Sequence, residues 1–462
     1  MKFMAYIIAG WSVFVLLIWI PVEYAHAAFC FNNYDLGIYG QALTLLSLKN
    51  LNPYLSTRDI RLFNDHFDPI LFLVAPLKAV VEPSLLAIRI EMSSIVLASL
   101  APIWLWLNRL ISKFQMSAVF FVILFSPMTL MAAFYPSHPG TWALAPLAWL
   151  LASIYARKDR LAITMLLLLL LCKEEFPILG GLLGVVLILQ KRQRLGFWIS
   201  TISVAWSFAV FFLRPIFLGK SDYYTSAMMA AHGVTGVGTG TWLFPLLELL
   251  FCIFMPLLIL RANKNFGFNR LKRDSWLMVC LPLVFLLLAI RIVGGYWGNH
   301  RAAPLAVLAA FMLMGTNDHM SKYRRTRRLL FFAVLLALVV PFLELGSRTW
   351  RDRPFKKHCP SSPERIDALN AVVNYLGVVG AESVLAGGNI VPHLVRIPGI
   401  AQIGATKADN FRFFVVEKGE YRNTWPISAG EMKQIEDDWR KRPGVSVLRD
   451  DQHVLLIENS SE

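Results

Sequence analysis

The sequence predicts a polytopic α-helical membrane protein of about 11 transmembrane helices, followed by a small extracytoplasmic α/β domain. Composition is the first indication, because 56% of the residues are hydrophobic and only 16% are charged. A soluble domain averages about 25% charged residues. Long apolar runs recur through residues 1–347, whereas residues 348–462 are charged and mix helical and strand periodicities. These two ranges are therefore the predicted domains.

Each predicted span is an apolar run of roughly the 20 residues that cross a bilayer. The spans are residues 4–22, 84–107, 116–134, 141–156, 161–172, 176–190, 195–214, 242–260, 276–293, 302–316 and 329–346. The runs at 161–172 and 176–190 are short, so residues 161–190 could form either one helix or two. Residues 68–81 are apolar but too short to span, so we expect a re-entrant or interfacial helix on the outer side there. Residues 36–48 have apolar positions near helical spacing, which predicts a helix along the outer surface.

The loops between these spans alternate in charge. Lys and Arg concentrate in residues 109–113, 157–160, 191–194, 261–273 and 322–328. Cytoplasmic loops retain basic residues. We therefore expect a protein of the bacterial inner membrane with a cytoplasmic amino terminus and a periplasmic carboxy-terminal domain. The first span resembles a signal peptide, but its cleavage would put the basic loops on the wrong side, which favours a retained helix. The net charge of +15 then suits anionic lipid headgroups as partners rather than nucleic acid.

Local periodicity also predicts the elements of the carboxy-terminal domain. We expect helices at 363–376 and 428–441, and strands at 383–386, 411–416, 445–448 and 453–457. Cys30 and Cys359 both fall on the predicted outer side, where oxidising conditions allow a disulfide. Two unpaired thiols are the alternative.

The remaining loops have few basic residues but hold most polar clusters able to support chemistry. These clusters are Tyr34-Asp35-Leu36-Gly37, Asn64-Asp65-His66-Phe67-Asp68, Ser137-His138-Pro139, Lys173-Glu174-Glu175 and Asn299-His300-Arg301. Asp35 follows the first span, where a carboxylate can act as a general base or contact a divalent cation. A helix N-cap is the structural alternative for Asp35.

The other clusters also have a functional and a structural interpretation. His66 and Asp68 can share protons or ligate a metal, although Asp68 before Pro69 also suits a capped helix start. Lys173 between apolar runs suggests a functional ion pair, with a simple outer loop as the alternative. Arg301 can bind a phosphate, or lie in an interfacial aromatic belt.

The order of these motifs carries a resemblance. Asp35-Leu36-Gly37 with Gln41, His66-Phe67-Asp68-Pro69, His138-Pro139 and Lys173-Glu174-Glu175 follow one another along the chain. This order resembles a family of uncharacterised bacterial membrane proteins known only as a domain of unknown function, most specifically over residues 30–190. That family in turn resembles the C-type (GT-C) glycosyltransferases, which use polyprenyl-phosphate sugars. One departure is that Pro136 and Gly140 stand where the family pattern places acids beside the turn histidine.

The resemblance implies a glycosyltransferase that uses a lipid-linked sugar donor, with Asp35 as its base or metal-contacting residue. The expected catalytic residues are Asp35, His66 and Asp68, and a Mg or Mn ion would contact Asp35 or Asp68. Expected substrate-binding residues are Tyr34, Gln41, His138, Lys173, Glu174, Glu175, His300 and Arg301. A flippase for lipid-linked intermediates and a non-catalytic scaffold are the alternatives. No oligomeric state is predicted.

Overall fold

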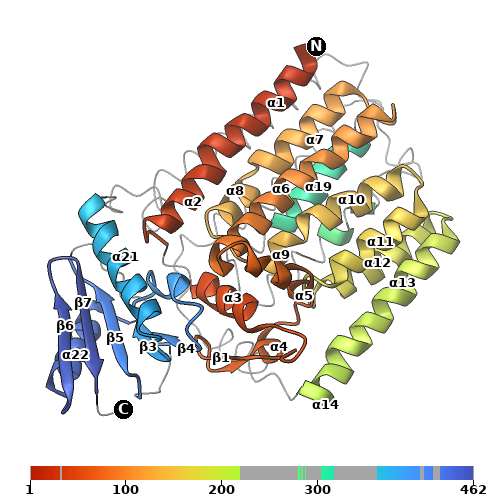
Figure 1. The fold of residues 1–462 in the computed structure, drawn as a ribbon. Coiled ribbons are helices and arrows are strands. Elements are labelled where there is room, and N and C mark those ends of the chain that lie inside the picture. Colours follow the sequence, from red (N-terminus) through yellow and green to blue (C-terminus); the bar gives the residue numbers. More distant parts are fainter. Residues whose placement is uncertain are drawn as a thin grey trace.

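The computed structural model describes residues 2–31, 34–218, 279–280, 282–284, 287, 303–316, 362–405, 410–419 and 427–460. A helix bundle and a sheet domain make up this part of the chain (Figure 1). The predicted spans at 242–260 and 329–346, and most of 276–293, lie outside the described residues.

Four of the described helical segments are long and apolar enough to cross a membrane. They are Met4–Ala27, Pro83–Leu107, Lys113–Ala133 and Gln193–Leu218. Shorter apolar helices cover Ile70–Ala79, Phe176–Leu189 and Ala303–Met312. The structure confirms a helical membrane protein, but it does not confirm the predicted total of about 11 spans.

The helices follow the predicted runs, with several interruptions. The first segment comprises α1 (Lys2–Phe14), η1 (Val15–Trp19) and α2 (Ile20–Ala27). The next elements are α3 (Tyr34–Leu45), α4 (Leu62–Asp65), α5 (Ile70–Val74), η2 (Ala75–Ala79) and α6 (Pro83–Leu107). After them come α7 (Lys113–Phe125), α8 (Pro127–Ala133), α9 (Pro139–Trp142) and α10 (Leu144–Tyr155). Proline at the start of α8 and of α9 explains both breaks, because it lacks the N–H that a continuing helix needs.

The region from 161 to 190 forms two helices, which resolves the alternative that the sequence left open. These are α11 (Asp159–Leu170) and α12 (Phe176–Leu189). A long segment follows, made of α13 (Gln193–Phe208), η3 (Ala209–Leu213) and α14 (Arg214–Leu218), and α19 (Ala303–Thr316) packs against α7. Gly184 and Gly196 allow α12 and α13 to approach closely, since a Cβ at Gly196 would lie 2.6 Å from the carbonyl oxygen of Gly184.

The carboxy-terminal domain is a five-stranded mixed sheet with a helix on each face. Its order is β4-β3-β5-β7-β6, with β3 parallel to β4 and β5 and the other pairs antiparallel. The bounds are α21 (Pro363–Val378), β3 (Ser383–Ala386), η10 (Val391–His393), β4 (Gly399–Gln402), β5 (Phe413–Glu417), α22 (Ala429–Lys441), β6 (Val445–Asp450) and β7 (Val454–Asn459). All the elements predicted here are confirmed within a few residues. Strand β4 was not predicted.

Alternate side chains of the strands explain the two covering helices. Phe413 and Val415 face α21, whereas Phe414 and Val416 belong to the apolar cluster under α22. Successive side chains of a strand point to opposite faces, so two helices bury both sides of β5. Ser428 begins α22 with a reciprocal capping box to Glu431.

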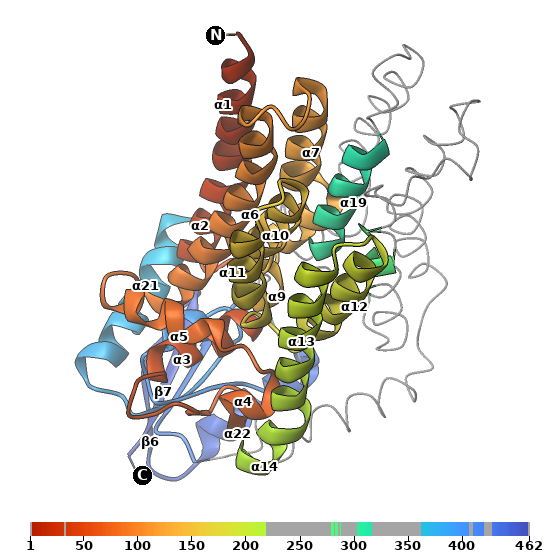
Figure 2. The same cartoon turned by 90° about the vertical axis from the view of Figure 1, so that its right-hand side faces the viewer.

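The sheet domain lies against the end of the bundle that carries α3 (Figures 1 and 2). Small residues permit this contact: a Cβ at Gly37 would lie 2.7 Å from Val391, and one at Gly40 would lie 3.0 Å from Val395 and 2.4 Å from the Ser84 hydroxyl of α6. That hydroxyl also donates to the Pro392 carbonyl at 2.6 Å. An unpredicted hairpin of β1 (Tyr54–Leu55) and β2 (Ile60–Arg61) lies beside this contact.

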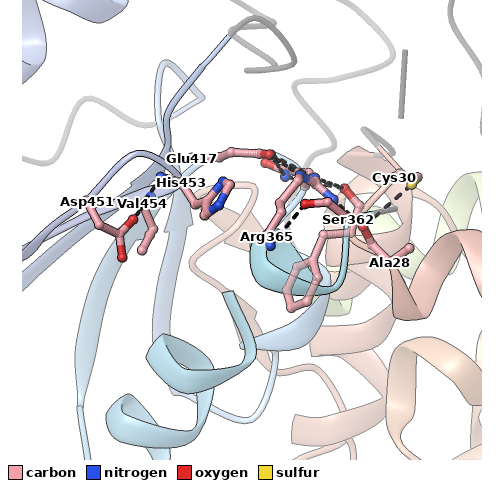
Figure 3. Close-up of polar contacts among 10 residues, drawn as sticks. Ala28, Cys30, Ser362, Arg365, Glu417, Asp451, His453 and Val454 are labelled. Atoms are coloured by element: carbon pink, nitrogen blue, oxygen red, sulfur yellow. Dashed lines mark hydrogen bonds and ion pairs between the residues drawn. The ribbon is translucent and has the colours of Figure 1, made fainter. Parts of the chain in front are cut away.

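A second contact ties α21 and β5 to the end of α2, and we call it the docking network (Arg365, Asn389 and Glu417 with the carbonyls of Ala28 and Phe29). Figure 3 shows Arg365 between Glu417 and Ala28. Its guanidinium bonds both oxygens of Glu417 and donates to the two carbonyls at 2.7 and 3.3 Å. The Asn389 amide donates to the Glu417 carboxylate at 2.5 Å and to the Phe29 carbonyl at 3.3 Å.

For Cys30 and Cys359 the sequence left a disulfide and two unpaired thiols open. Cys30, two residues beyond Ala28, is disulfide-bonded, so the unpaired alternative is wrong for Cys30. Cys359 lies outside the described residues. The thiols of Cys172 and Cys280 are free and buried.

Candidate functional site

Four polar segments that are far apart in the sequence meet at the end of the bundle that carries α3. They are the first turn of α3, residues 66–68 before α5, residues 135–138 before α9, and residues 173–175 between α11 and α12. We call the assembly of Asp35, Tyr39, His66, Asp68, Glu91, Tyr135, His138, Lys173 and Glu174 the polar cluster. All four loops belong to the basic-poor set that the sequence singled out.

Asp35 and His138 form an ion pair on one side of the cluster. The Asp35 carboxylate lies 3.1 Å from His138 Nε2 and accepts a hydrogen bond from the Tyr135 hydroxyl at 3.2 Å. His138 Nδ1 faces the Tyr135 carbonyl oxygen at 3.2 Å. Because a carbonyl only accepts, Nδ1 carries a proton, and a second proton on Nε2 would give an imidazolium that matches the Asp35 carboxylate.

The electrostatics of this pair keep Asp35 ionised. Burial by itself raises the pKa of Asp35, but the charge and hydrogen bond of His138, with the hydrogen bond of Tyr135, outweigh it. The resulting pKa is about 2. The side chain still keeps 32% of its surface exposed, so the carboxylate is reachable from outside. Asp35 lies inside the first turn of α3, one residue after its start at Tyr34.

Glu91 holds the turn that carries His138, and the sequence analysis missed it. This carboxylate is fully buried in α6, and its Oε2 accepts from the backbone N–H groups of Ser137 at 2.6 Å and His138 at 2.9 Å. Ser137 has a φ of 92°, which is unfavourable for a residue with a side chain. An acid in the middle of a predicted span was the available signal. The carboxylate thus reaches this turn from α6, although Pro136 and Gly140 replace the flanking acids.

Asp68 forms the other side of the cluster. It is 1% exposed, and its Oδ2 accepts a hydrogen bond from the Tyr39 hydroxyl at 2.9 Å. Its Oδ1 has no hydrogen-bond partner within the described part of the chain. Burial is the largest influence and raises the pKa of Asp68; the charge of His66 opposes it, and the pKa reaches about 7. This carboxyl therefore changes protonation near neutral pH, whereas Asp35 does not.

Glu174 and Lys173 complete this side. Glu174 lies 2.9 Å from His66 Nδ1 and accepts the backbone N–H of Phe67 at 3.1 Å, so it fixes the loop next to Asp68. Lys173 is 6% exposed, and a Cβ at Gly140 would lie 3.8 Å from it. This places the ammonium-bearing chain beside the loop of His138. Glu175 stands directly before α12 and is partly exposed.

Tyr39 connects the two sides. Besides its bond to Asp68, its ring lies 6.3 Å from the ring of His138 and 6.5 Å from that of Trp142. Tyr39 is on the same helix as Asp35, one turn further on, which places a phenol between the two acids. Neither Tyr39 nor Tyr135 was among the predicted site residues.

The remaining predicted residues are placed differently. Gln41 is buried, and its amide is engaged by Ser56, Thr57 and the Pro398 carbonyl, so it contributes to holding the hairpin and the sheet domain. His300 and Arg301 lie outside the described residues. Among the residues that the structure describes, no group of three or more His, Cys, Asp or Glu side chains is arranged to hold a metal ion. Asp35 and Asp68 contact separate partners.

The comparisons with known proteins agree with the membrane assignment. A family model described as predicted membrane protein (DUF2079) matches residues 25–408, which contain the whole polar cluster. No curated protein matches the chain. The family that the motif order resembled is thereby confirmed, while its relation to the GT-C enzymes stays a prediction. The matched residues cover most of the sequence, and this chain therefore belongs to the predicted membrane protein family DUF2079.

Proposed function

We propose that this chain is a membrane-embedded transferase that moves a sugar from a polyprenyl-phosphate donor to an acceptor hydroxyl at the polar cluster. In a bacterial inner membrane, the cluster and the sheet domain would face the periplasm, as the loop charges predict. The supporting observation is the contrast between Asp35 and Asp68, one ionised and the other with a pKa near neutrality, on two sides of Tyr39.

The chemistry assigns different tasks to the two acids. In the transfer, the acceptor oxygen forms a bond to the anomeric carbon, the bond from that carbon to the phosphate oxygen breaks, and its electron pair leaves with the phosphate. The acceptor proton needs a base, and a carboxyl of pKa about 7 suits that task better than one of pKa about 2. Asp68 is thus the proposed base, in place of Asp35.

Asp35, as the permanent carboxylate, would orient the acceptor or contact a divalent cation such as Mg or Mn. His138 holds Asp35 in position through the ion pair at 3.1 Å. Lys173 would neutralise the charge that develops on the leaving phosphate. His66 and Glu174 would hold the loop that carries Asp68.

The test uses the full chain purified in native lipid. Mass spectrometry would identify a copurifying polyprenyl-phosphate sugar, and a reconstituted assay would follow its transfer in wild type, Asp68→Asn and Asp35→Asn. Asp437→Asn is the matched control, because Asp437 is an exposed acid on α22. We expect both cluster variants to lose transfer at least 100-fold, with the control unchanged.

The outcomes separate the alternatives. A transfer rate that rises with pH through about 7 in wild type would support Asp68 as the base. Absence of both bound isoprenoid lipid and transfer would contradict the proposal and favour a scaffold. Lipid movement between leaflets without transfer would favour a flippase.

A further inference from the structure

Arg214 is a buried arginine in a predominantly apolar helix. The segment Gln193–Leu218 is long and apolar enough to cross a membrane, yet Arg214 lies within it and is only 7% exposed. Within the described part of the chain, its Nε and Nη2 atoms have no hydrogen-bond partner. Burying an unpaired charge is costly, so a guanidinium in this place indicates an anion that binds there.

The direction of Arg214 follows from the burial pattern of its helix. Ile199, Ser203, Val210 and Arg214 are buried and recur at near-helical spacing, so they form one stripe that faces the protein. Large apolar side chains on the rest of the surface are exposed, namely Phe208, Phe211, Phe212, Ile216 and Phe217. The five-residue π-helix η3 stands immediately before Arg214, and such turns often occur at functional sites. The guanidinium is thus on the inner side of a helix whose other side suits lipid chains.

The depth of Arg214 matches a headgroup layer. Gln193, which begins this segment, lies within the basic loop 191–194, and the helix rises about 30 Å from there to Arg214. That rise equals the thickness of the hydrocarbon core. Trp206 of this segment packs on Phe67 with ring centroids 6.4 Å apart, and Phe67 lies between His66 and Asp68. Arg214 begins α14, and α14 lies at the end of the bundle where α3 and α4 lie (Figures 1 and 2).

We propose that Arg214 binds the phosphate group of a membrane lipid at this end of the bundle. Nε and Nη2 lie on one edge of the planar guanidinium, which matches two oxygens of a phosphate. The lipid chains would follow the exposed apolar face of the same helix. The inference rests on the proposed function only in taking this lipid to be the sugar donor; the binding of a lipid phosphate itself does not require transfer.

The experiment measures lipid binding by the full chain in detergent. The probe is phosphatidic acid, a lipid with a phosphate monoester, and diacylglycerol is the uncharged comparison. Native mass spectrometry would give the fraction of protein that retains one lipid, and thermal unfolding would give the stabilisation by each lipid. Variants are Arg214→Gln and Arg214→Lys, with Arg194→Gln as the matched control because Arg194 is an exposed arginine near the opposite end of this helix.

We expect Arg214→Gln to bind phosphatidic acid at least tenfold more weakly than wild type, Arg214→Lys to be intermediate, and Arg194→Gln to be unchanged. Without lipid, Arg214→Gln should unfold at the wild-type temperature or above it, because its guanidinium has no hydrogen bond to lose at Nε or Nη2. Equal retention by wild type and Arg214→Gln would overturn the proposal.

Further arms identify the source of the phosphate and separate this inference from the transferase proposal. If inorganic phosphate stabilises wild type as well as phosphatidic acid does at equal concentration, the assignment to a lipid is wrong. Binding that depends on Arg214 in a protein without transfer activity would support this inference while contradicting the proposed function. Transfer that is unaffected by Arg214→Gln, with unchanged lipid retention, would overturn this inference alone.

Discussion

The docking network and the polar cluster are both buried sets of charge, but they differ in how completely their polar atoms are paired. In the docking network, all three guanidinium nitrogens of Arg365 and both oxygens of Glu417 have partners. In the polar cluster, Asp68 Oδ1 is buried without a hydrogen bond within the described residues, and so is the hydroxyl of Ser137, the residue before His138. Buried polar groups in proteins are normally paired. The comparison therefore assigns a structural role to the first set and leaves atoms available for a substrate in the second.

The two sets also connect different parts of the chain. The docking network joins the end of α2 to the sheet domain, at a sequence separation of 337 residues between Ala28 and Arg365. The polar cluster lies within residues 35–174 and uses only elements of the bundle. Substitutions in the docking network should therefore change the attachment of the sheet domain, and substitutions in the polar cluster should change proton uptake and reactivity.

Arg365→Ala should have the largest effect on stability. It leaves the carboxylate of Glu417 buried without its cation, which costs about 3–5 kcal/mol. Limited proteolysis and denaturant unfolding in detergent would detect release of the sheet domain. Arg412→Ala is the matched control, because the Arg412 side chain is 46% exposed, so that solvent screens its pair with Glu458 and the pair contributes at most about 1 kcal/mol. Equal stability of the two variants would contradict the structural role of the docking network.

Glu91→Leu should have the next largest effect. The backbone N–H groups of Ser137 and His138 would lose their common acceptor inside the protein, at a cost of about 2–4 kcal/mol. Glu91→Gln retains one acceptor oxygen and should cost less. Thermal unfolding of both variants measures this order, and a Leu variant as stable as the Gln variant would show that Glu91 does not hold the turn.

Asp68→Asn should change how stability depends on pH. The pKa of Asp68 is raised from 3.8 to about 7, so the folded state binds more protons than the unfolded state between these values. The contribution of Asp68 to the free energy of unfolding is therefore fully present below pH 3.8 and is lost as the pH rises to about 7. The asparagine variant has no such loss, and its stability relative to wild type should increase from pH 5 to pH 8. A difference independent of pH in denaturant titrations would exclude this titration.

The smallest effect concerns the Asp35–His138 pair. Since Asp35 is about one-third exposed, we expect a coupling energy of only about 1 kcal/mol. A double-mutant cycle with Asp35→Asn and His138→Gln measures it at neutral pH. Additive single effects would show that the contact at 3.1 Å contributes nothing to folding.

Local patterns in the sequence determined most of the helices and the elements of the carboxy-terminal domain. Apolar runs, proline positions and period-two alternation depend on neighbouring residues, so they predicted α3, α6 and β5 within a few residues. The charge alternation of the loops also selected the segments of Asp35, His138 and Glu174 before any contact was known. These inferences succeed because propensity and hydrophobic periodicity are short-range properties.

Only the tertiary structure decided what several of the polar side chains do. Gln41, which we expected to bind substrate, instead hydrogen-bonds the Pro398 carbonyl 357 positions away. Glu91 accepts the His138 backbone N–H from α6, whose sequence has the pattern of an ordinary membrane span. Strand β4 pairs with β3, and this pairing makes it a strand. The sequence around a carboxylate or an amide is the same whether that group bonds a backbone atom, a side chain or a ligand. Its pKa and its role depend on burial and on partners that folding brings from far along the chain.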